Sequence, residues 1–178
     1  MILETERLIL RSPTMKDVDD LIKNISDLKI SKWLLVVAYP YTKEDAEWWI
    51  NHCEEKGEKN YEFNIELKSS GELIGGVGLS NIKEEQGTAD IGYWLGTGHQ
   101  RKGIMSEAVK AVLDLAFNKL KLRRLEAPIF AGNEPSQGLA KSLGFIYEGT
   151  KRKAAICKAT GEIHDEVVYS LLVEDYKN

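Results

Sequence analysis

A strand–helix–strand segment in the middle of the chain constrains the fold more than any other feature. Residues 88–95 (TADIGYWL) and 123–130 (RRLEAPIF) have strand patterns and enclose one amphipathic helix. That helix carries apolar side chains at spacings of three and four, at Ala108, Val109, Val112, Leu113, Ala116 and Leu120. Antiparallel strand patterns flank this unit on both sides, so we predict a mixed sheet with helices on its faces.

The flanking segments read as strands and short helices. A strand is predicted at 6–11, and two helices follow Thr14 and Thr42, where Asp17 and Asp45 complete capping boxes. Strand patterns follow at 61–68 and 72–80, then, after the central unit, a helix at 133–144 and strands at 145–152 and 165–172. This order predicts one α/β domain over residues 1–178, with a mixed, mostly antiparallel sheet of about seven strands flanked by about four helices.

Composition narrows the classes of protein that fit. The chain has 178 residues, a net charge of −4 and a pI near 5.5, which argues against a nucleic-acid binder. No stretch reads as a signal peptide or membrane span, so no membrane partner is expected. The two cysteines, Cys53 and Cys157, form no metal-binding motif or disulfide framework. We therefore expect a cytoplasmic protein without a metal.

The start of the central helix is basic and contains glycine. Gln100, Arg101, Lys102 and Gly103 stand where the first amides of a helix are unpaired and where the helix dipole is positive. One interpretation is a solvated helix start; the other is an anion site, with Gly103 allowing phosphate oxygens close to the backbone. Basic residues oppose the dipole, and no good N-cap residue stands at 101–104, which favours the anion site.

These residues resemble the acetyl-CoA-binding motif of the GNAT superfamily of N-acetyltransferases, Gln/Arg-x-x-Gly-x-Gly/Ala. Gln100 and Gly103 match it, whereas Met105 stands in place of the usual small residue. Other segments resemble the RimJ/RimL branch, which acetylates the N-termini of ribosomal proteins: ETERLILR (4–11), PYTKEDAEWWI (40–50), NEPSQGLAKSLGF (133–145) and YEGTKR…GEIHDEVVYSLL (147–172). The resemblance thus covers nearly the whole chain.

The resemblance implies where acetyl-CoA binds. The pyrophosphate is expected on the amides of residues 101–105, and the pantetheine arm beside strand 91–95 as an added strand. A backbone N–H within 93–95 is expected to polarise the thioester carbonyl. The implied contacts are Tyr93, Trp94, Leu95, Gln100, Arg101, Lys102, Gly103, Ile104, Met105, Asn133 and Ser136.

The resemblance does not determine which groups act as general acid and general base. Many relatives carry a tyrosine that acts as general acid, seven residues after the asparagine that begins the helix at 133–144. Here that position is Ala140. Ser136 is the substitute we name, with a helix-capping serine as its alternative interpretation. For the base we name Asp90, where some relatives have a glutamate; the alternatives are a solvent-facing carboxylate or a water chain.

We therefore predict an N-acetyltransferase that uses acetyl-CoA as cosubstrate and a primary amine as acceptor. The acceptor is expected to be a protein N-terminus, such as that of a ribosomal protein. The amine attacks the thioester directly. Two alternatives stay open: an enzyme that acetylates a small amine such as a polyamine or an antibiotic, and a non-catalytic acyl-CoA-binding module. The protein is expected to be a monomer or a homodimer.

Overall fold

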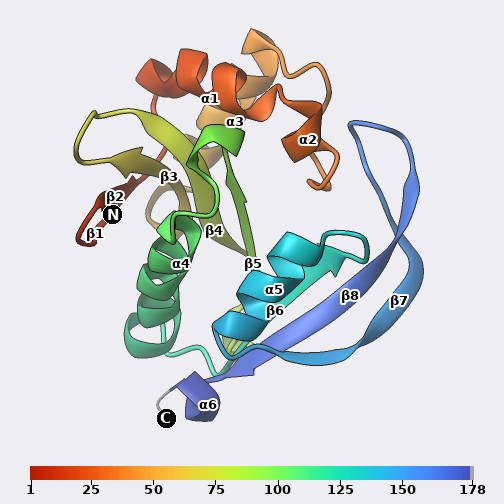
Figure 1. Ribbon diagram of the computed structural model, residues 1–178. Helices are drawn as coiled ribbons and strands as arrows, with labels where there is room; N and C mark the ends of the chain where they lie inside the picture. Colours follow the sequence, from red (N-terminus) through yellow and green to blue (C-terminus); the bar gives the residue numbers. More distant parts are fainter. Residues whose placement is uncertain (177–178) are drawn as a thin grey trace.

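The computed structural model describes residues 1–176 and contains one eight-stranded sheet in the order β1-β2-β3-β4-β5-β6-β8-β7 (Figure 1). Every neighbouring pair is antiparallel except β5 and β6, which are parallel because α4 joins them as a crossover. The strands are β1 (Ile2–Glu4), β2 (Leu8–Arg11), β3 (Glu62–Leu67), β4 (Leu73–Lys83), β5 (Thr88–Leu95), β6 (Arg124–Phe130), β7 (Ile146–Ile156) and β8 (Ile163–Leu172).

Helices cover both faces of the sheet. The helices α1 (Val18–Ile25), α2 (Leu28–Ser31) and α3 (Lys43–Glu55) lie on one face, whereas α4 (Ile104–Asp114) and α5 (Glu134–Ser142) lie on the other (Figure 1). A short α6 (Val173–Tyr176) follows β8. Single turns occur at Met15–Asp17, Gly57–Lys59, Glu84–Gln86 and Thr97–His99, and a π-helical turn at Leu115–Lys119 extends α4.

The predicted α/β class and the mixed sheet are confirmed, with corrections to the counts. The sheet has eight strands rather than about seven, because Ile2–Glu4 pairs with β2 as an additional edge strand. This strand has three residues and only one partly buried side chain, so its sequence carries almost no periodic signal. Besides the four predicted helices, the described residues contain α2 and α6, each of four residues.

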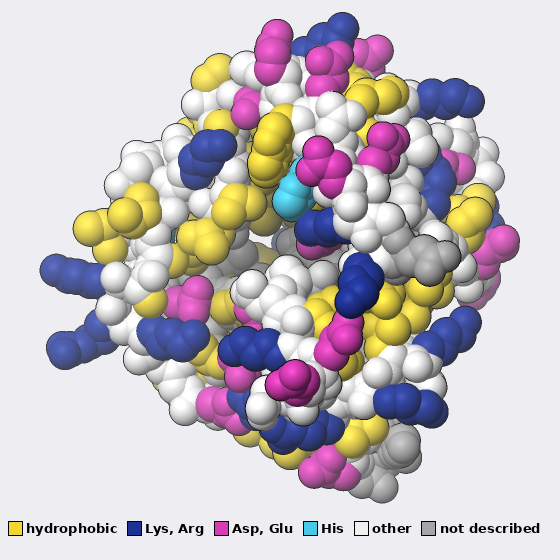
Figure 2. Space-filling model, turned by 180° about the vertical axis from the view of Figure 1, so that it is seen from behind, with side chains coloured by type: hydrophobic (Ala, Val, Ile, Leu, Met, Phe, Trp, Pro, Cys, Tyr) yellow, Lys and Arg dark blue, Asp and Glu magenta, His cyan; other side chains and the backbone are white. Residues whose placement is uncertain are grey.

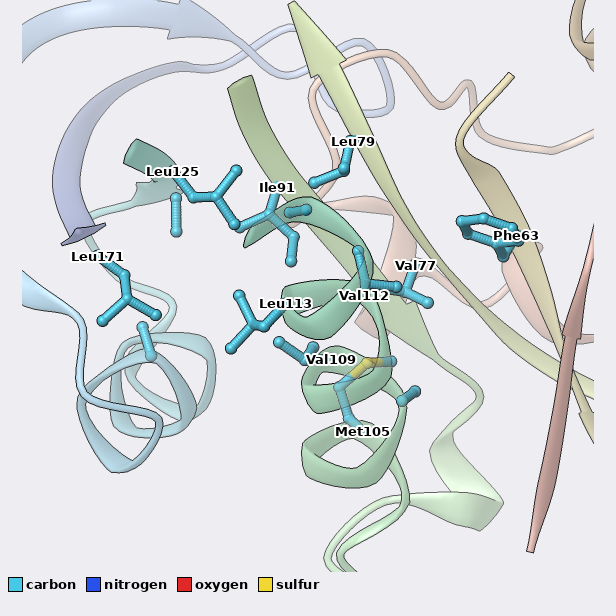
Figure 3. Close-up of a cluster of buried hydrophobic side chains, with 14 of the residues drawn as sticks. Phe63, Val77, Leu79, Ile91, Met105, Val109, Val112, Leu113, Leu125 and Leu171 are labelled. Carbon is cyan, nitrogen blue, oxygen red and sulfur yellow. The ribbon is translucent and has the colours of Figure 1, made fainter. Parts of the chain in front are cut away.

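Two hydrophobic clusters hold the helices to the sheet. The larger cluster lies between α4, α5 and the sheet, and Figure 3 shows Val109, Val112 and Leu113 of α4 pointing toward Ile91 of β5. The smaller cluster packs α1, α2 and α3 against the opposite face, where Trp94 of β5 joins it. Hydrophobic side chains of β5 therefore pack on both faces of the sheet, Ile91 on one and Trp94 on the other.

The surface carries both signs of charge. On the face seen in Figure 2, Lys and Arg side chains lie among Asp and Glu side chains, with hydrophobic side chains between them. Within residues 1–176, no helix is both long and apolar enough to cross a membrane.

Candidate active site

The parallel strands β5 and β6 pair only at their beginnings. Their register covers three positions, from Thr88 opposite Arg124 to Asp90 opposite Glu126. Both strands then continue, β5 to Leu95 and β6 to Phe130, without further pairing among the described residues. The edge of β5 over residues 91–95 is therefore open to an extended ligand that adds as a strand.

The loop from β5 to α4 lies next to this open edge. Its backbone is left-handed at Arg101 (φ 63°) and at Gly103 (φ 74°), the N-cap of α4. Alternation of this kind turns successive amides toward one side and forms an anion-binding concavity. The amide of Glu107 donates to the Gly103 carbonyl at 3.1 Å, so the amides of the preceding helical residues lie in the unpaired first turn.

Side chains brace the loop from within and from β2. Gln100 Nε2 donates to the carbonyl oxygen of Leu95 at 3.0 Å, and Lys102 Nζ donates to that of Gly98 at 2.8 Å. Arg7 Nη1 donates to the Lys102 carbonyl at 3.0 Å and Arg7 Nε to Glu107 at 2.6 Å. Gln100 therefore fixes the loop to the end of β5, and Arg7 of the segment before β2 places a cation beside the loop.

The unusual methionine of the motif points into the core. Met105 is 9% exposed and lies with Val109 in the larger cluster (Figure 3), as does Ile104. Its bulk is therefore taken up by the core side of α4. Although Met105 replaces a small residue, its side chain does not cover the outer side of the first helical turn, where the backbone amides lie.

A polar contact connects β5 to the start of α5. The Ser136 hydroxyl donates to the Tyr93 hydroxyl at 3.1 Å, and the Tyr93 hydroxyl donates to the Ser136 carbonyl at 3.1 Å. Burial raises the pKa of Tyr93, with the Ser136 contact acting in the opposite direction, so the phenol remains protonated near neutral pH. From the sequence, Tyr93 was expected to act only through its backbone, and no local pattern indicated a role for this phenol.

The first turn of α5 is capped by Asn133, not by Ser136. Asn133 Oδ1 accepts the amide of Ser136 at 3.3 Å, and Pro135 stands in the first turn. The helix-capping interpretation of the Ser136 side chain is therefore wrong, and its hydroxyl is left to contact Tyr93. Ala140, where relatives have a tyrosine, is buried at 2% exposure.

Asp90 lies at the base of the opening, on the face of β5 that also carries Trp94. Its carboxylate accepts a hydrogen bond from Asn81 Nδ2 at 2.7 Å and is partly buried, so it is not a fully solvated strand-edge group. Glu126 and Lys151 line a surface pocket with it. The Asp90 side chain thus lies on one face of β5, whereas Ser136 contacts Tyr93 on the other face.

Comparisons with known proteins identify the family. The model of the acetyltransferase (GNAT) domain matches residues 7–146, so the chain belongs to the GNAT family of N-acetyltransferases. An uncharacterized N-acetyltransferase, p20, of Bacillus licheniformis is 38% identical over 98% of this chain and 97% of its own length. The resemblance stated from the sequence is thereby confirmed.

Two further similarities concern substrates. The ribosomal-protein-serine acetyltransferase of Escherichia coli (strain K12) is 33% identical over 58% of this chain and 56% of its own length. The solved structure of the microcin C7 self-immunity acetyltransferase MccE, in complex with acetyl-CoA and AMP, superimposes with a TM-score of 0.80. It is 26% identical and covers 94% of this chain and 93% of its own.

Proposed function

We propose that the protein transfers the acetyl group of acetyl-CoA to a primary amine, in particular the N-terminal amine of a protein. The observation that carries the proposal is the open edge of β5 at 91–95 beside the braced loop at 100–105. One ligand with an extended amide-containing arm and a pyrophosphate would use both features. The acetyl-CoA complex of the similar MccE structure supports this choice of cosubstrate.

The residues present fit such a ligand. Gly103 has a left-handed φ of 74°, and a Cβ built there would approach only Arg7 Nη2, at 3.6 Å. The side of Gly103 toward a ligand is therefore free, and its amide is accessible to phosphate oxygens. Arg101, Lys102 and Arg7 place positive charge around the same loop, which favours a diphosphate.

The roles of the chain's own groups follow from this placement. A backbone N–H between Tyr93 and Leu95 holds the thioester carbonyl and stabilises negative charge on its oxygen. The hydroxyl pair of Ser136 and Tyr93 donates the proton that the leaving sulfur needs. The amine attacks the thioester directly, so no group of the chain is acetylated during turnover. A protein N-terminus as acceptor is supported by the E. coli relative that acts on a ribosomal protein.

The hydroxyl pair leads to a prediction about turnover. Replacing Tyr93→Phe or Ser136→Ala is expected to lower kcat about 10- to 100-fold, because each change removes part of the path that protonates the sulfur. The KM for acetyl-CoA should stay within about threefold, since neither hydroxyl is needed by the loop at 100–105. Steady-state kinetics by thiol release measures both parameters.

A matched control for Tyr93→Phe exists on the other side of α5. Tyr169 of β8 donates to Gln137 Oε1 at 3.2 Å, so Tyr169→Phe removes a similar phenol contact with the same helix. The control should retain kcat. Equal kcat values for wild type, Tyr93→Phe and Ser136→Ala would show that protonation does not involve this pair.

The proposed function is tested by incubating the protein with acetyl-CoA and three classes of amine. The acceptors are peptides with a free N-terminus, polyamines and aminoglycosides, and the readout is free thiol. We expect release with the peptides. Release with only the small amines would refute the protein acceptor, and CoA binding without release for any class would indicate a non-catalytic module.

A further inference from the structure

A second carboxylate lies on the face of the sheet opposite to α4 and α5. Glu62 of β3 is registered opposite Gly78 of β4, and Gly78 is registered opposite Gly92 of β5. Residues directly opposite one another in antiparallel strands project to the same face. Glu62, Gly78 and Gly92 therefore form a row across the sheet that ends at the open edge of β5.

The Glu62 carboxylate lies over β4 rather than beside it. A Cβ built on Gly78 would collide with Glu62 Oε2 and lie 2.7 Å from Glu62 Cδ, so only glycine leaves room for this side chain. A Cβ built on Gly92 would meet nothing within 4 Å. The Glu62 carboxylate thus lies at one end of the row. Open space lies at the other end, above Gly92 of β5, the strand that borders the proposed thioester site.

This carboxylate is half-buried without a hydrogen-bond donor among the described residues, whereas Glu66, four positions further on β3, pairs with Arg11 at 2.8 Å. Among the described side chains, Cys53 of α3 and Lys56, the C-cap of that helix, are the titratable groups that interact with it. Burial raises the pKa of Glu62, with Lys56 opposing the shift. A desolvated, unsatisfied carboxylate costs stability, so a structural role accounts poorly for it.

Distances across the sheet allow a proton path. Strands are about 4.8 Å apart, so a thioester added at the edge of β5 lies roughly 10 Å from β4. An attacking amine stands about 3 Å from the thioester carbon. One water with two hydrogen bonds of about 2.8 Å covers most of the remaining distance to Glu62.

We propose that Glu62 accepts the proton of the acceptor's ammonium group through one water held above Gly92. This inference rests on the proposed function. One ammonium proton passes through the water to Glu62 and later to solvent. The nitrogen then forms its bond to the carbonyl carbon as the carbon–sulfur bond breaks, and the sulfur takes a proton from the hydroxyl pair. The second nitrogen proton passes to solvent, and solvent returns one proton to the hydroxyl pair.

The decisive variant is Glu62→Gln, which keeps the shape and removes the base. We expect kcat to fall about 100-fold, while the affinity for acetyl-CoA is unchanged. In the wild type, kcat/KM should fall as pH decreases through a pKa above the ordinary Glu value of about 4.3, because protonated Glu62 accepts no proton. Glu62→Gln should lack this acidic limb, and Glu62→Asp should restore part of it.

Three further variants test the role of Glu62. Glu84→Gln removes an exposed carboxylate that pairs with Lys59 and should leave kcat unchanged. Gly92→Ala adds a methyl group where the water would lie and should lower kcat about 10-fold without a loss of folding, because the space is open. The Asp90→Asn profile is measured in parallel, since Asp90 is the next carboxylate along this face of β5.

The outcomes distinguish this inference from the proposed function. Full kcat and a retained acidic limb in Glu62→Gln would overturn the role of Glu62 while leaving the transferase in place. If only Asp90→Asn lost the acidic limb of the kcat/KM profile, the role of Glu62 would also be overturned, and Asp90 would be assigned as the base. An inactive wild type with every amine would overturn the proposed function itself.

Discussion

Gly103→Val is expected to weaken CoA binding about 100-fold. The valine side chain would occupy the space that phosphate oxygens need and would disturb the left-handed φ of 74° at the N-cap of α4. Losing one or two charge-assisted hydrogen bonds to backbone amides, at about 1.5–3 kcal/mol each, accounts for a change of this size. Isothermal titration with CoA measures it.

The control must separate ligand contact from backbone strain. Gly71, in the turn between β3 and β4, has a φ of 70° and open space around it, so Gly71→Val introduces a similar strain away from the loop. Both variants should lose about 1–2 kcal/mol of unfolding free energy. Only Gly103→Val should lose CoA affinity, and equal affinities for the two variants would refute the placement of the pyrophosphate.

Asp17→Ala is expected to reduce the unfolding free energy by about 3–5 kcal/mol, because it removes a buried, ion-paired carboxylate and leaves several hydrogen-bond donors without their acceptor. Asp17 is 3% exposed and its carboxylate accepts from Arg11 Nη1 and Nη2 at 2.8 and 2.7 Å. It also accepts from the Thr14 amide at 2.7 Å and from Asn64 Nδ2 at 3.0 Å. Chemical denaturation at pH 7 measures the loss.

The second capping box supplies the control for Asp17. Asp45 accepts from the Thr42 amide at 3.0 Å but is more exposed and has no arginine partner within the described part of the chain, so Asp45→Ala should cost only about 1 kcal/mol. Equal losses for the two variants would show that Arg11 and Asn64 contribute nothing beyond the cap.

The same carboxylate predicts a pH dependence. Burial raises the pKa of Asp17, but the hydrogen bond from Arg11 and the other contacts outweigh it, and the net pKa is lowered. The folded pKa is then below the unfolded value of about 3.9, so this stabilisation is present above that value and is lost as pH falls through the folded pKa. Asp17→Asn should lose stability less steeply than the wild type on acidification.

Local patterns predicted the central part of the fold well. The strand at 88–95 matches β5, and the apolar spacing after Gly103 matches α4, because both elements bury one continuous face and periodicity reports burial. The capping boxes at Thr14 and Thr42 are also local and were predicted. The pattern did not indicate that Asp17 would meet Asn64, since that contact joins elements far apart in the sequence.

The candidate site was predictable where it is made of backbone and less so where side chains converge. The loop at 100–105 follows from one short motif. Glu62 alternates with buried Phe63 as a solvent-facing strand residue would, whereas in the fold it is half-buried and lies near Cys53 of α3. The phenol of Tyr93 reaches Ser136 only because α5 returns beside β5, which is a property of topology rather than of local sequence.

A crystal structure with acetyl-CoA tests the central claim most directly. We predict the pyrophosphate within about 3 Å of backbone amides in the range 101–105 and the pantetheine arm along residues 91–95, between β5 and β6. The thioester carbonyl should accept a backbone N–H from within 93–95, next to the open space above Gly92. A pyrophosphate bound away from this loop, or an arm that does not enter between β5 and β6, would contradict the account.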